Sequence, residues 1–293
     1  MVQPSEFEST CLEPLPMTFW VNPTRTDTSK VISYANRRDI EVEPLQWNNE
    51  AFLLKSKVSL ATSYLYALGH IHIQEEVSMI PGVVANSLKP RTILDVCAAP
   101  GNKTAQVGIK QLSKTLLIAN EPHLGRHSAL RANLNRLGIH HAIFTKYDGA
   151  SFPRLKDKVD LVIADVPCSC EGTLRKSKSI NLNQKFVEKL IQTQKAITER
   201  AFLNLKVGGH LIYSTCTFNP TENEGVVQHL VQKFGTAIKV RPFEIAQFKH
   251  SPGLDAWEGS NFDPQLKNSI RIWPQQNNSG GFFISLLEKC DEV

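Results

Sequence analysis

From residue 91 onward, short apolar runs alternate with amphipathic segments. The runs at 92–98 and 115–120 are each followed by helical spacing of apolar residues, at 103–112 and 124–137. The alternation continues with apolar runs at 142–147, 159–164 and 210–214 and helical segments at 186–205 and 221–234. Because strands that alternate with helices form a parallel sheet covered on both faces, this pattern predicts an α/β fold.

Two further apolar runs close the chain, at 269–273 and 282–287. They flank Asn277-Asn-Ser-Gly-Gly281, a sequence rich in turn-forming residues, and so predict a hairpin. The expected sheet therefore has seven strands and is mostly parallel.

A smaller α/β pattern precedes this region. Apolar runs at 19–22, 40–45 and 51–54 surround a helical segment at 29–38, and three prolines predict an irregular stretch over residues 1–20. We expect a small N-terminal subdomain over residues 1–70 and a larger domain over residues 71–293.

Composition excludes several classes of protein. No apolar run approaches the roughly 20 residues of a membrane span, and no basic segment followed by an apolar one marks a signal peptide. The six cysteines are scattered and include no Cys-x-x-Cys pair, so we expect reduced thiols, a cytoplasmic location and no metal site.

Acidic residues end three successive predicted strands, namely Asp95, Glu121 and Asp148. Asp95 opens the sequence Asp95-Val-Cys-Ala-Ala-Pro-Gly-Asn-Lys-Thr104, whose small residues let the backbone approach a ligand at a helix N-terminus. The absence of Gly-x-Gly-x-x-Gly argues against a dinucleotide pyrophosphate. The three acids suit a nucleoside with a cationic appendage, such as S-adenosylmethionine, because an acid at a strand end can accept both ribose hydroxyls. The sequence also leaves open that each acid only caps a helix or turn.

Two cysteines follow two later predicted strands that we expect to be neighbours. Cys168 lies in Asp165-Val-Pro-Cys168, and Cys216 lies in Tyr213-Ser-Thr-Cys216. A thiolate can add to carbon 6 of an electron-poor pyrimidine, which makes carbon 5 nucleophilic enough to accept a methyl group; a base then removes the carbon-5 proton and the thiol leaves. Without this context, the sequence around Cys216 favours a small buried filler over a nucleophile, and the chemistry does not rank the two thiols.

Segments 95–104, 165–172 and 213–224 together resemble the Sun-domain (Fmu-type, RsmB–RsmF-type) RNA cytosine-5 methyltransferases. The resemblance spans roughly residues 70–288, with a weaker part at 19–57. It implies a Rossmann-like, S-adenosylmethionine-dependent methyltransferase fold with an RRM-like N-terminal subdomain. The implied reaction is methylation of carbon 5 of cytosine in structured RNA, either tRNA, which is slightly favoured, or rRNA.

The same resemblance implies roles for individual residues. Cys216 would be the nucleophile, and Cys168 would assist proton removal and product release. Asp165 would hold the cytosine edge and Lys103 would line the active site. S-adenosylmethionine would be bound by residues of the loop after the first strand and by acids at strand ends: Cys97, Ala98, Ala99, Pro100, Gly101, Asn102, Lys103, Glu121, Asp148 and Asp165.

Basic residues are concentrated between 171 and 206, where eight Lys or Arg stand against three Glu, whereas residues 1–90 hold seven basic and ten acidic residues. This uneven charge predicts that a polyanion binds the later stretch, with Arg175, Lys176 and Lys178 as the expected RNA contacts. A solvated helix face is the alternative.

The N-terminal subdomain contains aromatic residues that could stack on bases, namely Phe19, Trp20 and Trp47. Its net acidic charge favours a packing role for them instead.

Cys170 stands where the resembling family usually has glycine. It either fills space or allows an oxidative disulfide with Cys168. The sequence leaves two other functions open. One is a thiol-redox protein that uses Cys168 and Cys170, and the other is a non-catalytic RNA-binding protein that retains the fold. The presence of Asp165, Cys168 and Cys216 together favours a catalyst, which we expect to act as a monomer.

Overall fold

The computed structural model describes residues 4–110, 115–177, 180 and 183–293. Its larger sheet has nine strands in the order β11 (Ser251–Pro252), β14 (Ile270–Ile272), β15 (Phe282–Lys289), β9 (Leu205–Thr215), β8 (Val159–Asp165), β5 (Thr92–Asp95), β6 (Leu116–Asn120) and β7 (Ala142–Thr145), with β10 (Ile238–Arg241) also paired to β15. The five strands from β9 to β7 are parallel, and β15 joins them antiparallel. The mostly parallel sheet is confirmed. The predicted count of seven is wrong because β10 and β11, of four and two residues, are too short to give a periodic signal.

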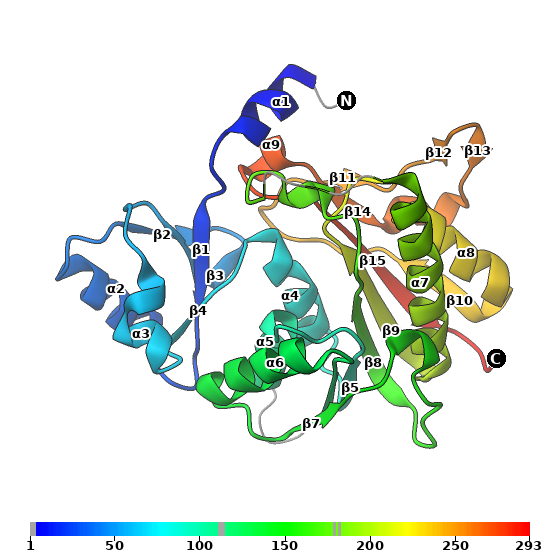
Figure 1. Cartoon of the computed structure of the whole chain (residues 1–293), viewed down its shortest axis with the longest axis horizontal. Helices are drawn as coiled ribbons and strands as arrows, with labels where there is room; N and C mark the ends of the chain where they lie inside the picture. Colours follow the sequence, from blue (N-terminus) through cyan, green and yellow to red (C-terminus); the bar gives the residue numbers. More distant parts are fainter. Residues whose placement is uncertain (1–3, 111–114, 178–179, 181–182) are drawn as a thin grey trace.

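Helices cover both faces of this sheet (Figure 1). One face carries α4 (Ile80–Ser87), α5 (Asn102–Lys110) and α6 (Leu124–Leu137), and the other carries α7 (Gln184–Leu203) and α8 (Glu224–Phe234). The alternation of side chains along β8 shows why. Ile163 belongs to the apolar core that includes Leu130 of α6, whereas its neighbour Val162 belongs to the core that includes Phe202 of α7.

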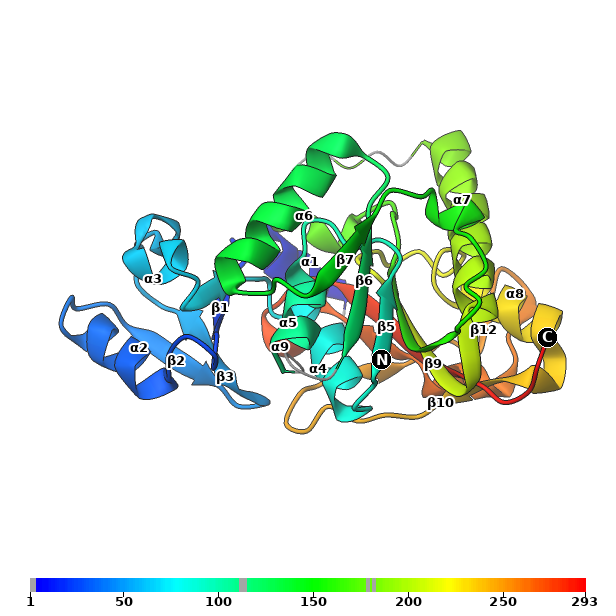
Figure 2. The same cartoon turned by 90° about the horizontal axis from the view of Figure 1, so that it is seen from below.

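The smaller sheet lies beside the larger one and is clearly separate from it in the second view (Figure 2). It is antiparallel, with the order β2 (Val42–Leu45), β3 (Asn48–Leu54), β1 (Met17–Val21) and β4 (Ile71–Ile73), and is accompanied by α2 (Thr28–Asn36) and α3 (Tyr64–Ala67). Because β4 pairs with β1, the small sheet extends past residue 70, where the sequence places the domain limit.

The aromatic residues of the small sheet are used for packing. Phe19 and Trp20 are 1% and 4% exposed. Phe19 stacks on Phe52, and Trp20 Nε1 donates a hydrogen bond of 2.8 Å to Gln74. The expected packing role is confirmed for these two rings.

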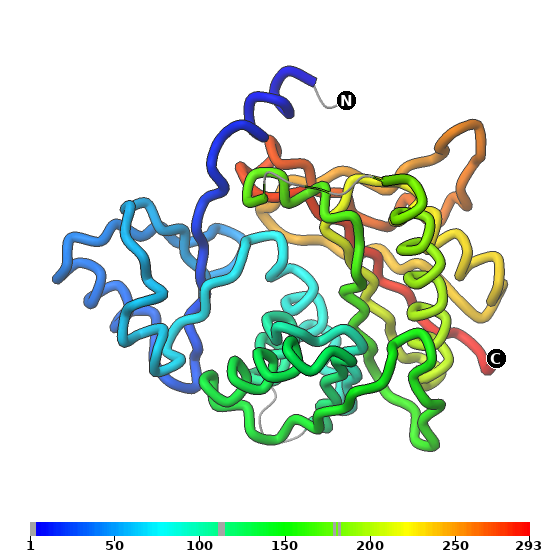
Figure 3. The backbone as a smooth tube through the Cα atoms, in the orientation of Figure 1, coloured from blue at the N-terminus to red at the C-terminus, as the bar shows by residue number. Residues whose placement is uncertain are grey.

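The first twenty residues are not wholly irregular, which corrects the prediction. Residues Pro4–Leu12 form α1, whose proline occupies the first helical position, where it is tolerated. Phe7 of α1 packs edge-on against Phe218 and Trp273, with ring centroids 5.4 and 6.1 Å apart. The tube in Figure 3 shows the chain running from this helix directly into β1.

Two boundaries also differ from the prediction. α8 begins at Glu224, three residues after the expected start at 221, because Asn219 Oδ1 accepts hydrogen bonds from the backbone and hydroxyl of Thr221 and holds a turn there. The expected hairpin of β14 and β15 is confirmed, but its connection contains a short helix, α9 (Pro274–Asn277). A small separate hairpin is formed by β12 (Ala256–Trp257) and β13 (Ser260–Asn261). No helix among the described residues is both long enough and apolar enough to span a membrane.

Candidate active site

The carboxyl ends of β8 and β9 bring two thiols together. These strands are parallel neighbours, with Asp165 at the end of β8 opposite Ser214 of β9. Cys168 follows β8 and Cys216 directly follows β9, and their Sγ atoms are 3.5 Å apart. The predicted adjacency of the two strands and of the thiols at their ends is confirmed.

Hydrogen bonds between the two loops fix this arrangement. Ser169 Oγ and Thr217 Oγ1 are 2.7 Å apart, and Gly172 N donates to the carbonyl of Cys216 at 2.8 Å. Glu222 is fully buried and its Oε2 accepts hydrogen bonds from Ser169 N and from Gln194 Nε2 of α7, at 3.0 and 2.8 Å. Sequence reasoning missed this support, because Ser169 and Gln194 lie 53 and 28 residues from Glu222 along the chain.

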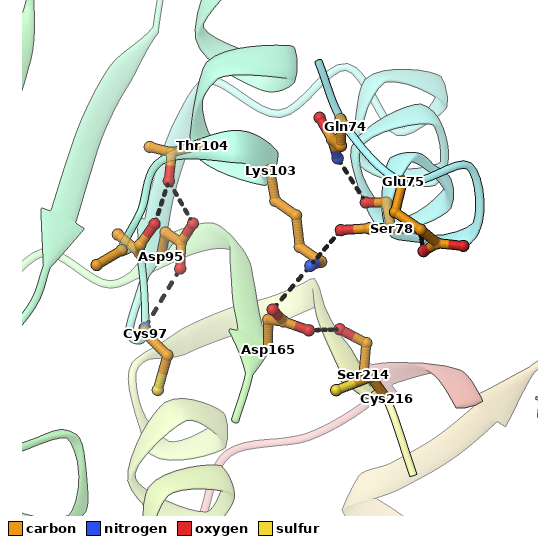
Figure 4. Close-up of polar contacts among 12 residues, drawn as sticks. Gln74, Glu75, Ser78, Asp95, Cys97, Lys103, Thr104, Asp165, Ser214 and Cys216 are labelled. Atoms are coloured by element: carbon orange, nitrogen blue, oxygen red, sulfur yellow. Dashed lines mark hydrogen bonds and ion pairs between the residues drawn. The ribbon is translucent and has the colours of Figure 1, made fainter. Parts of the chain in front are cut away.

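Lys103 and Asp165 form an ion pair at the same edge of the sheet (Figure 4). Lys103 Nζ donates to Asp165 Oδ2 at 2.7 Å and to Ser78 Oγ at 3.0 Å, while Ser214 Oγ donates to Asp165 Oδ1 at 2.8 Å. The carboxylate is therefore held from both sides, which fixes its orientation next to Cys216.

A cavity of about 300 Å³ opens beside this pair. Its lining includes Asp165, Lys103 and Cys216, together with Glu75 and Phe282. The side chain of Asp165 is 32% exposed, whereas that of Lys103 is only 10% exposed. A molecule in the cavity can therefore reach the carboxylate and the thiol while the lysine stays anchored, and the volume is at the lower end of the range for ligand pockets.

A third thiol belongs to the same cluster. Cys170 Sγ lies 3.9 Å from Cys168 Sγ, and Cys170 is exposed whereas Cys168 is buried. Hydrogen bonds from Cys168 and Cys216 lower the pKa of Cys170 to about 3. Interaction with Cys170 raises the pKa of Cys168. The hydrogen bond with Cys168 favours ionisation of Cys216, but Cys170 and burial outweigh it and raise the pKa of Cys216.

The loop after β5 is shaped by Asp95 and a glycine. Asp95 accepts hydrogen bonds from Thr104 Oγ1 at 2.6 Å and Cys97 N at 3.3 Å, and burial raises the pKa of its carboxyl to about 7. Gly101 has φ +105°, and a Cβ there would meet Leu130 at 3.1 Å. The loop therefore depends on Gly101 to pack against α6.

The acids after β6 and β7 have different surroundings. Glu121 is 1% exposed; it accepts a hydrogen bond from His123 N at 2.9 Å and lies 3.3 Å from an Arg126 nitrogen. Asp148 is exposed and accepts a hydrogen bond from Ala150 N at 3.1 Å. Since a carboxylate has about four acceptor sites, Glu121 keeps capacity for two ribose hydroxyls. The three acids thus lie at or just after the ends of three adjacent strands, residues 97–101 lie in the loop from β5 to α5, and Asn102 and Lys103 are the first residues of that helix.

The three residues predicted to contact RNA differ in what the structure shows of their surroundings. Arg175 already donates to the carbonyls of Glu13, Pro14 and Ser279 and to the side chain of Asn278, so its guanidinium ties the N-terminal segment to the loop before β15. Lys176 lines the cavity beside Cys216. Lys178 lies outside the described residues, so its expected role stays a prediction.

Comparison with known proteins places this arrangement in a family. Residues 84–288 match the family described as 16S rRNA methyltransferase RsmB/F, which is more than half of the chain. The chain belongs to this RsmB/F family. A tRNA (cytosine(49)-C(5))-methyltransferase of Pyrococcus abyssi is 34% identical over 290 residues, which cover 97% of this chain and 91% of that protein.

Other members of the RsmB/F family are longer. The ribosomal RNA small subunit methyltransferase F of Shewanella oneidensis is 34% identical over 297 residues, which cover 98% of this chain but only 60% of that protein. Among solved structures, a methyltransferase homologue from Pyrococcus horikoshii superposes with a TM-score of 0.84 at 26% identity, covering 97% of this chain and 90% of that one. NSun6 from the same organism, solved with SFG, has a TM-score of 0.83 at 20% identity, covers 98% and 94% of the two chains, and supports the fold.

A second set of residues links the small sheet of this RsmB/F family member to the loop after β5. His72 of β4 lies with Nε2 2.9 Å from Asn102 Oδ1, at the start of α5, and with Nδ1 2.7 Å from Arg136. Arg136 also donates to the carbonyl of Tyr66 and stacks over its ring at 3.9 Å. Sequence reasoning did not identify this bridge, because its partners are 30 and 64 residues from His72 along the chain.

The bridge predicts a particular dependence of stability on pH. Burial, with the neighbouring Arg136, lowers the pKa of His72 to about 4, although the hydrogen bond with Asn102 acts in the opposite direction. In the unfolded chain His72 binds a proton near pH 6.5, whereas in the folded chain it stays neutral until about pH 4. Its contribution therefore lowers the free energy of unfolding as the pH falls from 7 towards 4, by up to roughly 3 kcal/mol. We expect His72→Gln to lose less stability than the wild type over this range, measured by urea unfolding at several pH values. Equal slopes for the two proteins would contradict the assignment of a neutral, buried His72.

Proposed function

We propose that this protein transfers a methyl group from S-adenosylmethionine to carbon 5 of cytosine in structured RNA. The observation that carries the proposal is the pair of thiols, 3.5 Å apart, beside the carboxylate that Lys103 and Ser214 hold in place. Membership of the RsmB/F family favours this function over a thiol-redox protein or a non-catalytic RNA-binding protein.

In the proposed reaction, each side chain acts on a stated atom. The Cys216 thiolate adds to carbon 6 of the cytosine, and the electron pair displaced from the 5,6 double bond makes carbon 5 nucleophilic. Asp165 holds the ring nitrogen and exocyclic amine of the cytosine and stabilises the adduct. Cys168 assists removal of the carbon-5 proton, which restores the double bond and breaks the bond between Cys216 and carbon 6. S-adenosylmethionine, when bound, supplies the electrophilic methyl group that carbon 5 takes up.

The residues that would hold the cofactor are those whose surroundings suit an adenosyl group. Glu121 would accept the ribose hydroxyls, and Asp148 would accept from the adenine amine. The backbone of residues 97–103 would line the remaining part, with Asp95 supporting that loop through Cys97 N. A target base stacked in a helix would have to be flipped out to reach the cavity.

For the substrate we favour tRNA slightly over rRNA. The Pyrococcus abyssi relative, at 34% identity, is named for tRNA, and the Shewanella oneidensis relative, also at 34% identity, is named for ribosomal RNA. Lys176, on the cavity lining, is positioned for a phosphate next to the target cytosine.

We expect the purified protein to make individual cytosines of tRNA resistant to bisulfite when S-adenosylmethionine is supplied, with less modification of 16S rRNA transcripts. Bisulfite sequencing of both RNAs, with and without protein, measures the position and extent. Reactions without S-adenosylmethionine are the control. Methyl incorporation without bisulfite-resistant cytosines would sink the proposal of carbon-5 chemistry, and preference for rRNA would overturn the substrate.

A further inference from the structure

The proposed reaction uses two of the three clustered thiols and leaves Cys170 without a role. Cys170 Sγ lies 3.9 Å from Cys168 Sγ, and all three sulfur atoms, including that of Cys216, lie within 4.8 Å of one another. We propose that Cys168, Cys170 and Cys216 form a binding site for one thiophilic metal ion of the zinc class. The sequence did not predict a metal site, because Cys216 is 46 residues from Cys170 and only the pairing of β8 with β9 brings the third thiol in.

The distances between the sulfur atoms fit this coordination. Zinc bound tetrahedrally by thiolates at about 2.3 Å places their sulfur atoms about 3.8 Å apart. The Cys168–Cys216 and Cys168–Cys170 separations of 3.5 and 3.9 Å bracket that value. Small side-chain rotations would therefore place all three sulfur atoms around one ion and leave a fourth position for water.

The backbone presets the cluster and gives an ion access to it. Cys170 has φ +62°, an uncommon conformation for a residue other than glycine, and this turns the chain so that its thiol comes back towards Cys168. Cys170 is exposed, whereas Cys216 is partly buried on the cavity lining and Cys168 is buried. An ion can thus enter at Cys170, and the two inner thiols, of Cys168 and Cys216, can then complete its coordination.

Binding of a metal ion would make both thiols that the proposed function needs, Cys168 and Cys216, unavailable for the reaction. Coordination releases the thiol protons and ties up the sulfur electron pairs, so Cys216 could not add to a base and Cys168 could not accept a proton. This inhibition rests on the proposed function, whereas metal binding itself does not. Thiophilic metal ions are therefore expected to switch the protein off reversibly.

The test counts zinc on the full chain, purified in a phosphine reductant so that no disulfide removes a ligand. We expect one zinc ion per chain in competition with a chromophoric chelator. Cobalt(II) should give thiolate-to-metal charge-transfer absorption. Cys170→Gly, which suits the positive φ, should weaken zinc binding by at least about 100-fold, since even residues that only support metal ligands contribute 10- to 100-fold. The control is Cys11→Ser with Cys290→Ser, which removes two free cysteines outside the cluster and should bind zinc like the wild type.

The outcomes separate the two proposals. Equal zinc affinity in the wild type and in Cys170→Gly, or cobalt spectra without thiolate bands, would overturn the metal site. Cys170→Ser, which keeps the side-chain size, and circular-dichroism melting together exclude misfolding as the cause of lost binding. If methylation is observed, stoichiometric zinc should inhibit the wild type and leave Cys170→Gly active, and a chelator should restore the wild type. An absence of methylation in metal-free buffer counts against the proposed function alone, because the zinc count still decides the site.

Discussion

Replacing Cys216 by serine is expected to lower the rate of methyl transfer by roughly 10⁴-fold or more, in line with the loss of a covalent nucleophile in other enzymes. A serine hydroxyl is far less ionised and less nucleophilic than a thiol, and Cys216 is the only cysteine among the described residues that line the cavity. Initial rates with tritiated S-adenosylmethionine and tRNA measure the loss.

The fold should tolerate this change, because serine is close to cysteine in size and Cys216 is only partly buried. Cys290→Ser is a matched control, because Cys290 is also a partly buried free cysteine and lies directly after β15, outside the thiol cluster. Turnover by Cys216→Ser within tenfold of the control would show that Cys216 does not attack the base.

The sequence predicts the position of the candidate site where a general rule relates the order of elements in the chain to their arrangement in the fold. Alternating strands and helices gave the parallel sheet, and the rule that ligands bind at the carboxyl ends of such strands gave the location. The strands that precede Cys168 and Cys216 were expected to be neighbours. In the observed order β9-β8-β5-β6-β7 they are, so Asp165, Cys168 and Cys216 lie together. Lys103 reaches them because α5 starts at the same edge of the sheet.

Contacts that depend on side-chain direction or on distant loops were not predictable in this way. Arg175 lies in a basic stretch and was expected to bind phosphate, yet its guanidinium is bound to oxygen atoms of residues more than 100 positions away. The bridge from His72 to Arg136 likewise depends on how two sheets dock, and periodicity carries no information on docking. For Arg175 the local pattern gave a basic stretch but not the partners of the guanidinium, and no local pattern pointed to the bridge of His72.

The order of the two thiols in the reaction was implied by family resemblance alone, since both sulfur atoms lie at the same edge of the sheet and DNA cytosine methyltransferases attack through a Pro-Cys cysteine. Cys168→Ala provides an independent assignment. If Cys216 attacks and Cys168 assists proton removal, this variant should form the adduct but release it slowly, so protein joined covalently to RNA accumulates. We expect a shifted band on a denaturing gel when the variant is mixed with tRNA and S-adenosylmethionine, and a fall in turnover on the order of 10²- to 10⁴-fold, the range for loss of general acid–base help.

The two single variants, Cys168→Ala and Cys216→Ser, separate this interpretation from its reverse, and their control is the double variant Cys168→Ala with Cys216→Ser. It should give no shifted band, because the attacking thiol is gone, while Cys170→Ala, which removes the neighbouring thiol 3.9 Å from Cys168, should release product and also give none. If Cys168 were the nucleophile, the band would instead appear with Cys216→Ser and vanish with Cys168→Ala. The two single variants therefore give opposite patterns under the two assignments, and one gel decides which sulfur atom bonds to carbon 6.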